Sequence, residues 1–262
     1  MNSPSFALRR GAAALLSSLV LFGAAADAAS FTLSSPAANT FDDWPTVVPA
    51  GTGFELAYQH YEQSGLSSIQ IRGFAADGKA LGNAKPIASP TALIGHPRLL
   101  RAHAGKYGLT WLEQANGITG TTIDTATGAI AKPVALTLPS AALYDVTRLS
   151  NGNIAAAHVY MDKSNVPNIR VRAAITSATP TFGTIAKNAA LPGSDNPYTT
   201  PGSPDQTVVG DGAGGALAVY RDRTDGNLYV VKVSAKGVPA ATRTRVNLAA
   251  MKVGSPNEMA GF

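Results

Sequence analysis

The same order of short strands and turns occurs four times between residues 41 and 250, and this repetition restricts the fold more than any other feature. Each unit has a short first strand, a glycine-containing turn, an apolar strand ending in a bulky ring, an alternating strand and a further turn. The aligned rings are Tyr58, Trp111, His158 and Tyr220, which are 53, 47 and 62 residues apart. The predicted units are residues 41–90, 91–140, 141–200 and 201–250.

Strict alternation of apolar and polar residues at 69–72 and 169–172 is typical of half-buried antiparallel strands. No segment after Ala29 has the periodicity of a helix. A small antiparallel sheet cannot bury both of its faces alone, so repeated sheets pack face to face around an axis. The sequence therefore predicts an all-β, β-propeller-like fold of about four to five four-stranded blades, with Tyr58, Trp111 and Tyr220 packed between blades.

The repeated unit, an apolar strand ending in an aromatic residue and an alternating strand followed by a turn such as Asp77-Gly78-Lys79, resembles the propeller-like repeats of secreted bacterial surface and sialidase-like proteins. The resemblance covers about residues 41–262, and it implies a fold more than a function. The S-x-D-x-G-x-T-W box of sialidases is absent from every unit. That departure argues against sialidase activity.

Both ends of the repeat array carry partial units. Residues 31–36 resemble the last strand of a unit, and residues 256–262 resemble the first strand of another. Two arrangements remain open: the ends share a partial fifth blade, or the chain is a truncated piece of a longer propeller. The second is slightly favoured, because the sequence stops where a unit begins.

The N-terminal segment has the three parts of a secretory signal peptide in the right order. Arg9 and Arg10 precede an apolar stretch, and Ala26-Asp27-Ala28 fits the small-x-small rule for cleavage. The apolar stretch is shorter than the ~20 residues that span a bilayer. We therefore predict a signal peptide at 1–28, a single domain at 29–262 without a membrane span, and a periplasmic or extracellular location.

Composition excludes several classes of chemistry. The absence of cysteine excludes disulfides and thiolate sites. The net charge of +5 comes from scattered basic residues without a stripe, so no nucleic-acid partner is predicted. No catalytic, metal or cofactor motif is recognisable, and Asp222 with Asp225 is predicted to form a turn instead of a calcium loop. We expect a monomer without catalytic residues, metals or cofactors.

In a propeller the first strand of each blade lines the central channel, so residues where these strands start are expected to meet at one mouth. The candidate ligand-binding residues are Asp43, Trp44, His96, Arg98, Asp145, Arg148 and Asp205, with Asn257 in the trailing strand. Crowded carboxylates beside arginine and histidine suit a sugar, a cation or an acid/base pair. The competing interpretation is structural, because aspartate is favoured in turns.

These observations favour an exported, non-catalytic binding or cell-surface protein whose partner is a carbohydrate or another surface protein. The alternative is a glycoside hydrolase or sialidase-like hydrolase that uses carboxylates at the channel mouth. Trp44 and Trp111 are the only tryptophans, and this scarcity of aromatic platforms counts against the enzyme.

Overall fold

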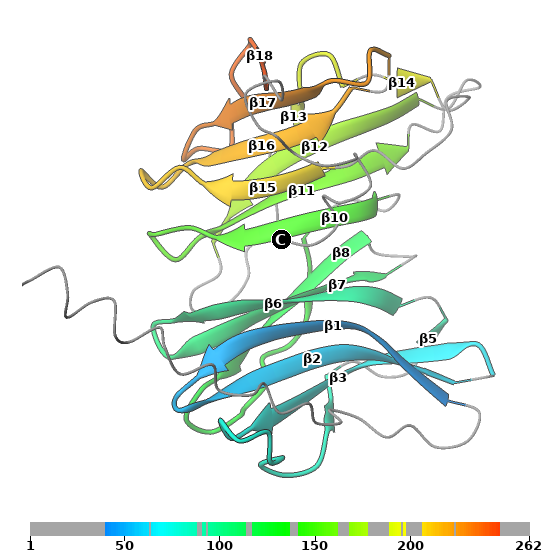
Figure 1. The fold of residues 1–262 in the computed structure, drawn as a ribbon, viewed down its shortest axis with the longest axis vertical. Coiled ribbons are helices and arrows are strands. Elements are labelled where there is room, and N and C mark those ends of the chain that lie inside the picture. Colours follow the sequence, from blue (N-terminus) through cyan, green and yellow to red (C-terminus); the bar gives the residue numbers. More distant parts are fainter. Residues whose placement is uncertain are drawn as a thin grey trace, which may run out of the picture. The chain divides into compact units, whose positions relative to one another are not determined.

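The structure is a computed structural model that describes residues 40–62, 64–87, 91–92, 94–113, 117–136, 141–161, 168–177, 189–194, 196–197, 206–222 and 224–246. Among these residues every regular element is a β-strand, and the strands form four antiparallel sheets that follow the sequence (Figure 1). The all-β prediction is confirmed. The predicted signal peptide at 1–28 lies outside the described residues, as do Asp205 and Asn257.

The first two sheets span the N-terminal half of the array. The first consists of β1 (Thr40–Ala50), β2 (Gly53–Glu62), β3 (Leu66–Phe74), β4 (Lys85–Pro86) and β5 (Thr91–Ala92). The second consists of β6 (Ile94–His103), β7 (Lys106–Glu113), β8 (Gly117–Asp124) and β9 (Val134–Ala135).

The other two sheets follow in the same order. The third consists of β10 (Ala141–Arg148), β11 (Ile154–Met161), β12 (Asn168–Thr176), β13 (Ala189–Ala190) and β14 (Asn196–Pro197). The fourth consists of β15 (Gln206–Gly210), β16 (Ala216–Arg221), β17 (Leu228–Val233) and β18 (Thr244–Arg245). The first and third sheets are five-stranded, which differs from the predicted four. Their third strands are nine residues long, so two short strands pair with different parts of each.

The strand register confirms the alignment of the four rings. Each ring lies opposite a third-strand residue that also pairs with the second residue of the short fourth strand. These rows are Tyr58–Gln70–Pro86, Trp111–Thr119–Ala135, His158–Arg172–Ala190 and Tyr220–Tyr229–Arg245. All four rings are buried, with 7% exposure or less. The units therefore superpose residue by residue at this level.

Apolar side chains fill the space between successive sheets. Trp111 packs with Ile69 and Leu99 between the first and second sheets, and Tyr144 packs with Leu100 between the second and third. Tyr220 packs among residues of the third and fourth sheets. Alanines in the second strands leave room for these rings and for close approach of the sheets: Ala57, Ala155, Ala156, Ala157, Ala216 and Ala218. Each face that one sheet cannot bury alone is thus covered by its neighbour.

Candidate functional site

The first strands of successive sheets contact one another, β1 with β6, β6 with β10 and β10 with β15. Three of them have a register shift near their starts: β1 between Asp43 and Thr46, β6 between Gly95 and Arg98, and β10 between Ala141 and Tyr144. In β1 and β6 the bulge holds a ring followed by proline, Trp44-Pro45 and His96-Pro97. Proline cannot donate to the ladder, so a bulge is where a strand tolerates it.

Trp44 and His96 both adopt left-handed backbone conformations, each with φ of 53°. This region disfavours residues with a Cβ, and a residue before proline is normally extended, so the conformation is costly at both positions. The two rings lie together, with centroids 4.0 Å apart and planes inclined by 44°. Trp44 is nevertheless 44% exposed. Strained residues of this kind concentrate at functional sites.

Carboxylates flank this ring pair. Asp43 is exposed, and its Oδ1 accepts a hydrogen bond from the Trp44 N–H at 2.7 Å. Asp42 points elsewhere and pairs with His60, with Oδ1 and Nδ1 2.7 Å apart. The charge of Asp43 acts on His96, the partner of the Trp44 ring, whereas that of Asp42 acts on Tyr58. Asp43 is therefore the described carboxylate best placed beside Trp44.

His96 is held in place from the third sheet. The Tyr144 hydroxyl donates to the His96 carbonyl at 2.6 Å and lies 3.3 Å from the Thr110 hydroxyl. Burial lowers the pKa of His96, the nearby Arg98 lowers it further, and Asp43 opposes both effects. His96 is consequently a neutral imidazole at neutral pH, which can both donate and accept hydrogen bonds.

Arg98 extends the site toward the third sheet. Its Nε lies 3.8 Å from Asp145 Oδ1, and the two side chains are 37% and 25% exposed. Asp145 Oδ2 accepts hydrogen bonds from the Thr207 hydroxyl at 2.6 Å and from the Val208 N–H at 3.0 Å. Ring contact, charge interactions and this ion pair link a set that we name the inner-strand cluster. Its members are Asp43, Trp44, His96, Arg98 and Asp145.

Five of the seven residues predicted from the sequence thus come together. Arg148 does not join them, because it ends β10 beside the hairpin turn, where its Nη1 donates to the Gly152 carbonyl at 3.1 Å. Asp145 and Arg148 are three residues apart and so face opposite sides of the strand, a signal that the sequence already contained. Asp205, the seventh, lies outside the described residues.

The guanidinium of Arg148 is poorly paired, so replacing this residue should not destabilise the fold. Its Nε and Nη2 are buried and have no hydrogen-bond partner among the described residues, and burial lowers the pKa of the guanidinium. We expect Arg148→Met to leave the free energy of unfolding unchanged or raise it by up to about 2 kcal/mol, because it removes a poorly solvated charge. Urea unfolding measures this, with Arg101→Met as the control at an exposed position. A loss above about 1 kcal/mol would contradict the expectation.

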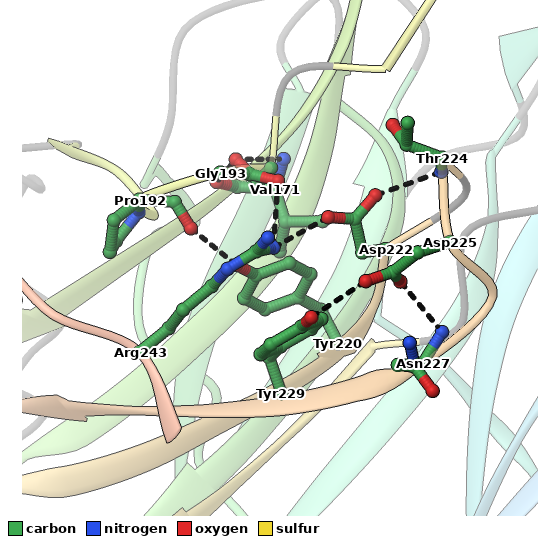
Figure 2. Close-up of polar contacts among 11 residues, drawn as sticks. Val171, Pro192, Gly193, Tyr220, Asp222, Thr224, Asp225, Asn227, Tyr229 and Arg243 are labelled. Atoms are coloured by element: carbon green, nitrogen blue, oxygen red, sulfur yellow. Dashed lines mark hydrogen bonds and ion pairs between the residues drawn. The ribbon is translucent and has the colours of Figure 1, made fainter. Parts of the chain in front are cut away.

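A second polar cluster surrounds Arg243 (Figure 2). Arg243 Nη1 donates to Asp222 Oδ2 at 2.6 Å and to the Gly193 carbonyl at 3.1 Å. Its Cζ lies 3.7 Å from the centroid of the Tyr229 ring, as expected of a cation–π contact. The Tyr229 hydroxyl donates to Asp225, and this bond with those from Asn227 lowers the pKa of Asp225 to about 2. The cluster ties the segment before β14 to the fourth sheet.

Sequence reasoning missed the Arg243 cluster. It identified Asp222 and Asp225 as turn residues, which is confirmed by hydrogen bonds from the Thr224 and Asn227 amides. It grouped Arg243 with Arg221, Arg223 and Arg245 as the closest approach to a basic cluster and assigned it no partner. The pairing joins residues 21 positions apart, and no local pattern indicates it. Only the register of β16, β17 and β18 brings them together.

Within the described ranges, no group of three or more histidine or acidic side chains is placed to hold a metal ion. No helix in that part of the chain has the length and hydropathy needed to cross a membrane.

Neither the protein-family models nor the curated proteins that were compared match this chain. Solved structures do. The α-L-arabinanase of Penicillium chrysogenum complexed with arabinobiose is 16% identical and superposes with a TM-score of 0.53 over 74% of this chain and 63% of its own. This chain thus covers less than two thirds of that enzyme.

Two further structures superpose less well. The GH43_1 enzyme of Xanthomonas citri complexed with xylose is 12% identical, with a TM-score of 0.49 over 80% of this chain and 74% of its own. The α-L-arabinanase of Cellvibrio cellulosa complexed with arabinohexaose is 9% identical, with a TM-score of 0.47 over 74% and 75%.

The Penicillium comparison confirms the predicted propeller class for the fold. The comparison does not show the predicted resemblance to sialidase-like proteins in particular. It also corrects the functional expectation: the preference for a non-catalytic binding protein is wrong, because the protein that shares the fold is an α-L-arabinanase.

Proposed function

We propose that this protein is a glycoside hydrolase that acts on arabinose-containing oligosaccharides at the inner-strand cluster. The observation that carries the proposal is the exposed ring of Trp44, held in a costly left-handed conformation directly after the exposed carboxylate of Asp43. The same strain occurs at two equivalent positions of neighbouring strands, each within a bulge. Bulges of this kind serve to aim side chains at functional sites.

The cluster has the chemistry that binds a sugar. The face of an indole packs against the C–H groups of a sugar ring, and His96 supports the Trp44 ring from one side. Arg98 donates hydrogen bonds, Asp43 accepts them, and the neutral His96 does both. These groups together match the hydroxyls of a neutral sugar, which need both donors and acceptors.

Hydrolysis of a glycoside takes two carboxyl groups, one to protonate the leaving oxygen and one to act as base or nucleophile. We assign the second role to Asp43, because it is exposed beside the sugar platform. The candidates for the proton donor are Asp145 and Asp205, the other acidic residues of the predicted channel mouth. The substrate class follows the arabinobiose bound to the Penicillium enzyme of the same fold.

A substrate panel tests the proposal. The purified protein is incubated with arabino-oligosaccharides, xylo-oligosaccharides and aryl glycosides, and released sugar is measured by chromatography. We expect release from arabinobiose or arabinohexaose. No release from any member of the panel, by protein whose circular dichroism and thermal transition show it to be folded, would contradict the function.

We also propose that the protein acts outside the cytoplasm after removal of residues 1–28. The signal-like order of Arg9-Arg10, the apolar stretch and Ala26-Asp27-Ala28 supports this. Expression of the full chain with its N-terminus, followed by mass spectrometry of the secreted fraction, is expected to give a chain that begins at Ala29. An intact N-terminus retained in the cytoplasm would refute export.

A further inference from the structure

One row of residues runs across each sheet at the same level and ends at the first residue of the short fourth strand. In the first strands these equivalent residues are Thr46, Arg98, Asp145 and Thr207. They pair with Ala57, Thr110, Ala157 and Val219. The shared level allows the contacts between neighbouring first strands to be compared directly.

The contact between the first and second sheets recurs between the third and fourth. Thr46 Oγ1 accepts a hydrogen bond from the N–H of Leu99, the residue after Arg98, at 3.2 Å. Asp145 Oδ2 accepts one from the N–H of Val208, the residue after Thr207, at 3.0 Å. In both cases a side-chain oxygen at the shared level accepts a hydrogen bond from a backbone amide of the next sheet. We name this contact the clamp.

Asp145 differs from Thr46 because its side chain is charged and has a second oxygen, which faces a cation. Oδ1 faces the Arg98 guanidinium of the second sheet, while Oδ2 receives the Thr207 hydroxyl as well as the Val208 amide. The neighbouring Tyr144 points the other way, to the His96 carbonyl. Two consecutive residues of β10 thus hold both the second and the fourth sheets, and the contacts of the Asp145 carboxylate are all with these neighbouring sheets.

We propose that Asp145 is a positioning residue, which clamps β10 to β15 and fixes Arg98 within the inner-strand cluster, and that it takes no part in bond cleavage. The inference rests on the proposed hydrolase function and narrows it, because it removes Asp145 from the candidate proton donors. Thr46 shows that the clamp itself needs only an oxygen, whereas holding Arg98 needs a carboxylate.

Two variants separate these roles. Asp145→Thr introduces the residue found at the equivalent position of β1 and retains a hydrogen-bond acceptor. Asp145→Val introduces a side chain of nearly the same shape as threonine but without an acceptor. Amide hydrogen exchange at Val208 is expected to stay within about 3-fold of wild type in Asp145→Thr and to accelerate about 10-fold or more in Asp145→Val. On arabinohexaose, Asp145→Thr is expected to raise KM about 10-fold with kcat within about 3-fold, because only the hold on Arg98 is lost.

Three results would overturn the proposal. If amide hydrogen exchange at Val208 is unchanged in Asp145→Val, the clamp does not protect this amide and the proposal is wrong. A fall in kcat for Asp145→Thr as large as that for Asp43→Asn would make Asp145 catalytic. If wild-type protein hydrolyses no substrate, both the proposed function and the positioning role of Asp145 are wrong. The hydrogen-exchange measurement uses no substrate, so it still shows whether the clamp exists. Melting temperatures of both variants verify that they are folded.

Discussion

Asp43→Asn is expected to lower kcat/KM on arabino-oligosaccharides about 10³-fold or more, with the fold unchanged. Loss of a positioned acid, base or nucleophile removes 10²- to 10⁴-fold of rate, roughly, because no other group stands in for it. The asparagine side chain keeps an oxygen that can accept the Trp44 N–H, so the bulge and the platform are retained. The fall should therefore appear mainly in kcat, with KM little changed.

Asp77→Asn is the matched control for this substitution. Asp77 is also exposed and also accepts one backbone N–H, that of Lys79 at 2.9 Å, but it lies in the turn after β3. We expect its kcat/KM to stay within about 2-fold of wild type. Activity of Asp43→Asn within about 10-fold of wild type would exclude Asp43 as the reacting carboxylate.

Asp222→Ala is expected to lower the free energy of unfolding by about 3 kcal/mol. The Asp222 side chain is only 5% exposed, and its removal leaves the Arg243 guanidinium, 27% exposed, without its carboxylate. Breaking a buried ion pair on one side is costly because a poorly solvated charge remains. For a chain of this size the loss corresponds to a melting temperature lower by about 6–12 °C, which calorimetry or circular dichroism measures.

Two controls test whether loss of the Asp222–Arg243 ion pair causes the decrease in stability. Arg245→Ala removes an exposed arginine two residues along, which donates to Asn227, and should cost about 0.5 kcal/mol or less. The double variant Asp222→Ala/Arg243→Met should recover part of the stability, because the unpaired charge is gone. A double variant less stable than Asp222→Ala would show that Arg243 contributes chiefly through Tyr229 and Gly193.

Much of the fold could be predicted from the sequence because small sheets have a simple pattern. Alternation with a period of two identified the strands, and the rings at 58, 111, 158 and 220 aligned because each lies at the same level of its second strand, which continues beyond the ring. Five members of the predicted site converge for a related reason. First strands that start alike and neighbour one another must bring their starting residues together.

Other features depend on register and long-range pairing, which the sequence does not display. The register of β10 shifts between Ala141 and Tyr144, just before Asp145, so the direction of Asp145 toward Val208 could not be read from alternation along the strand. The left-handed conformations of Trp44 and His96 run against the usual preference before proline. The partners of Arg243 come from elements that meet only in the folded sheet.

Tryptophan fluorescence during titration with arabinohexaose tests most directly whether the inner-strand cluster is the sugar site. The Asp43→Asn protein is used so that the sugar persists, and Trp44 reports because it is 44% exposed while Trp111 is fully buried. The account predicts a saturable change in emission that disappears when Trp44→Phe is added to the same protein. No change with Trp44 present, or an equal change after Trp44→Phe, would contradict the account.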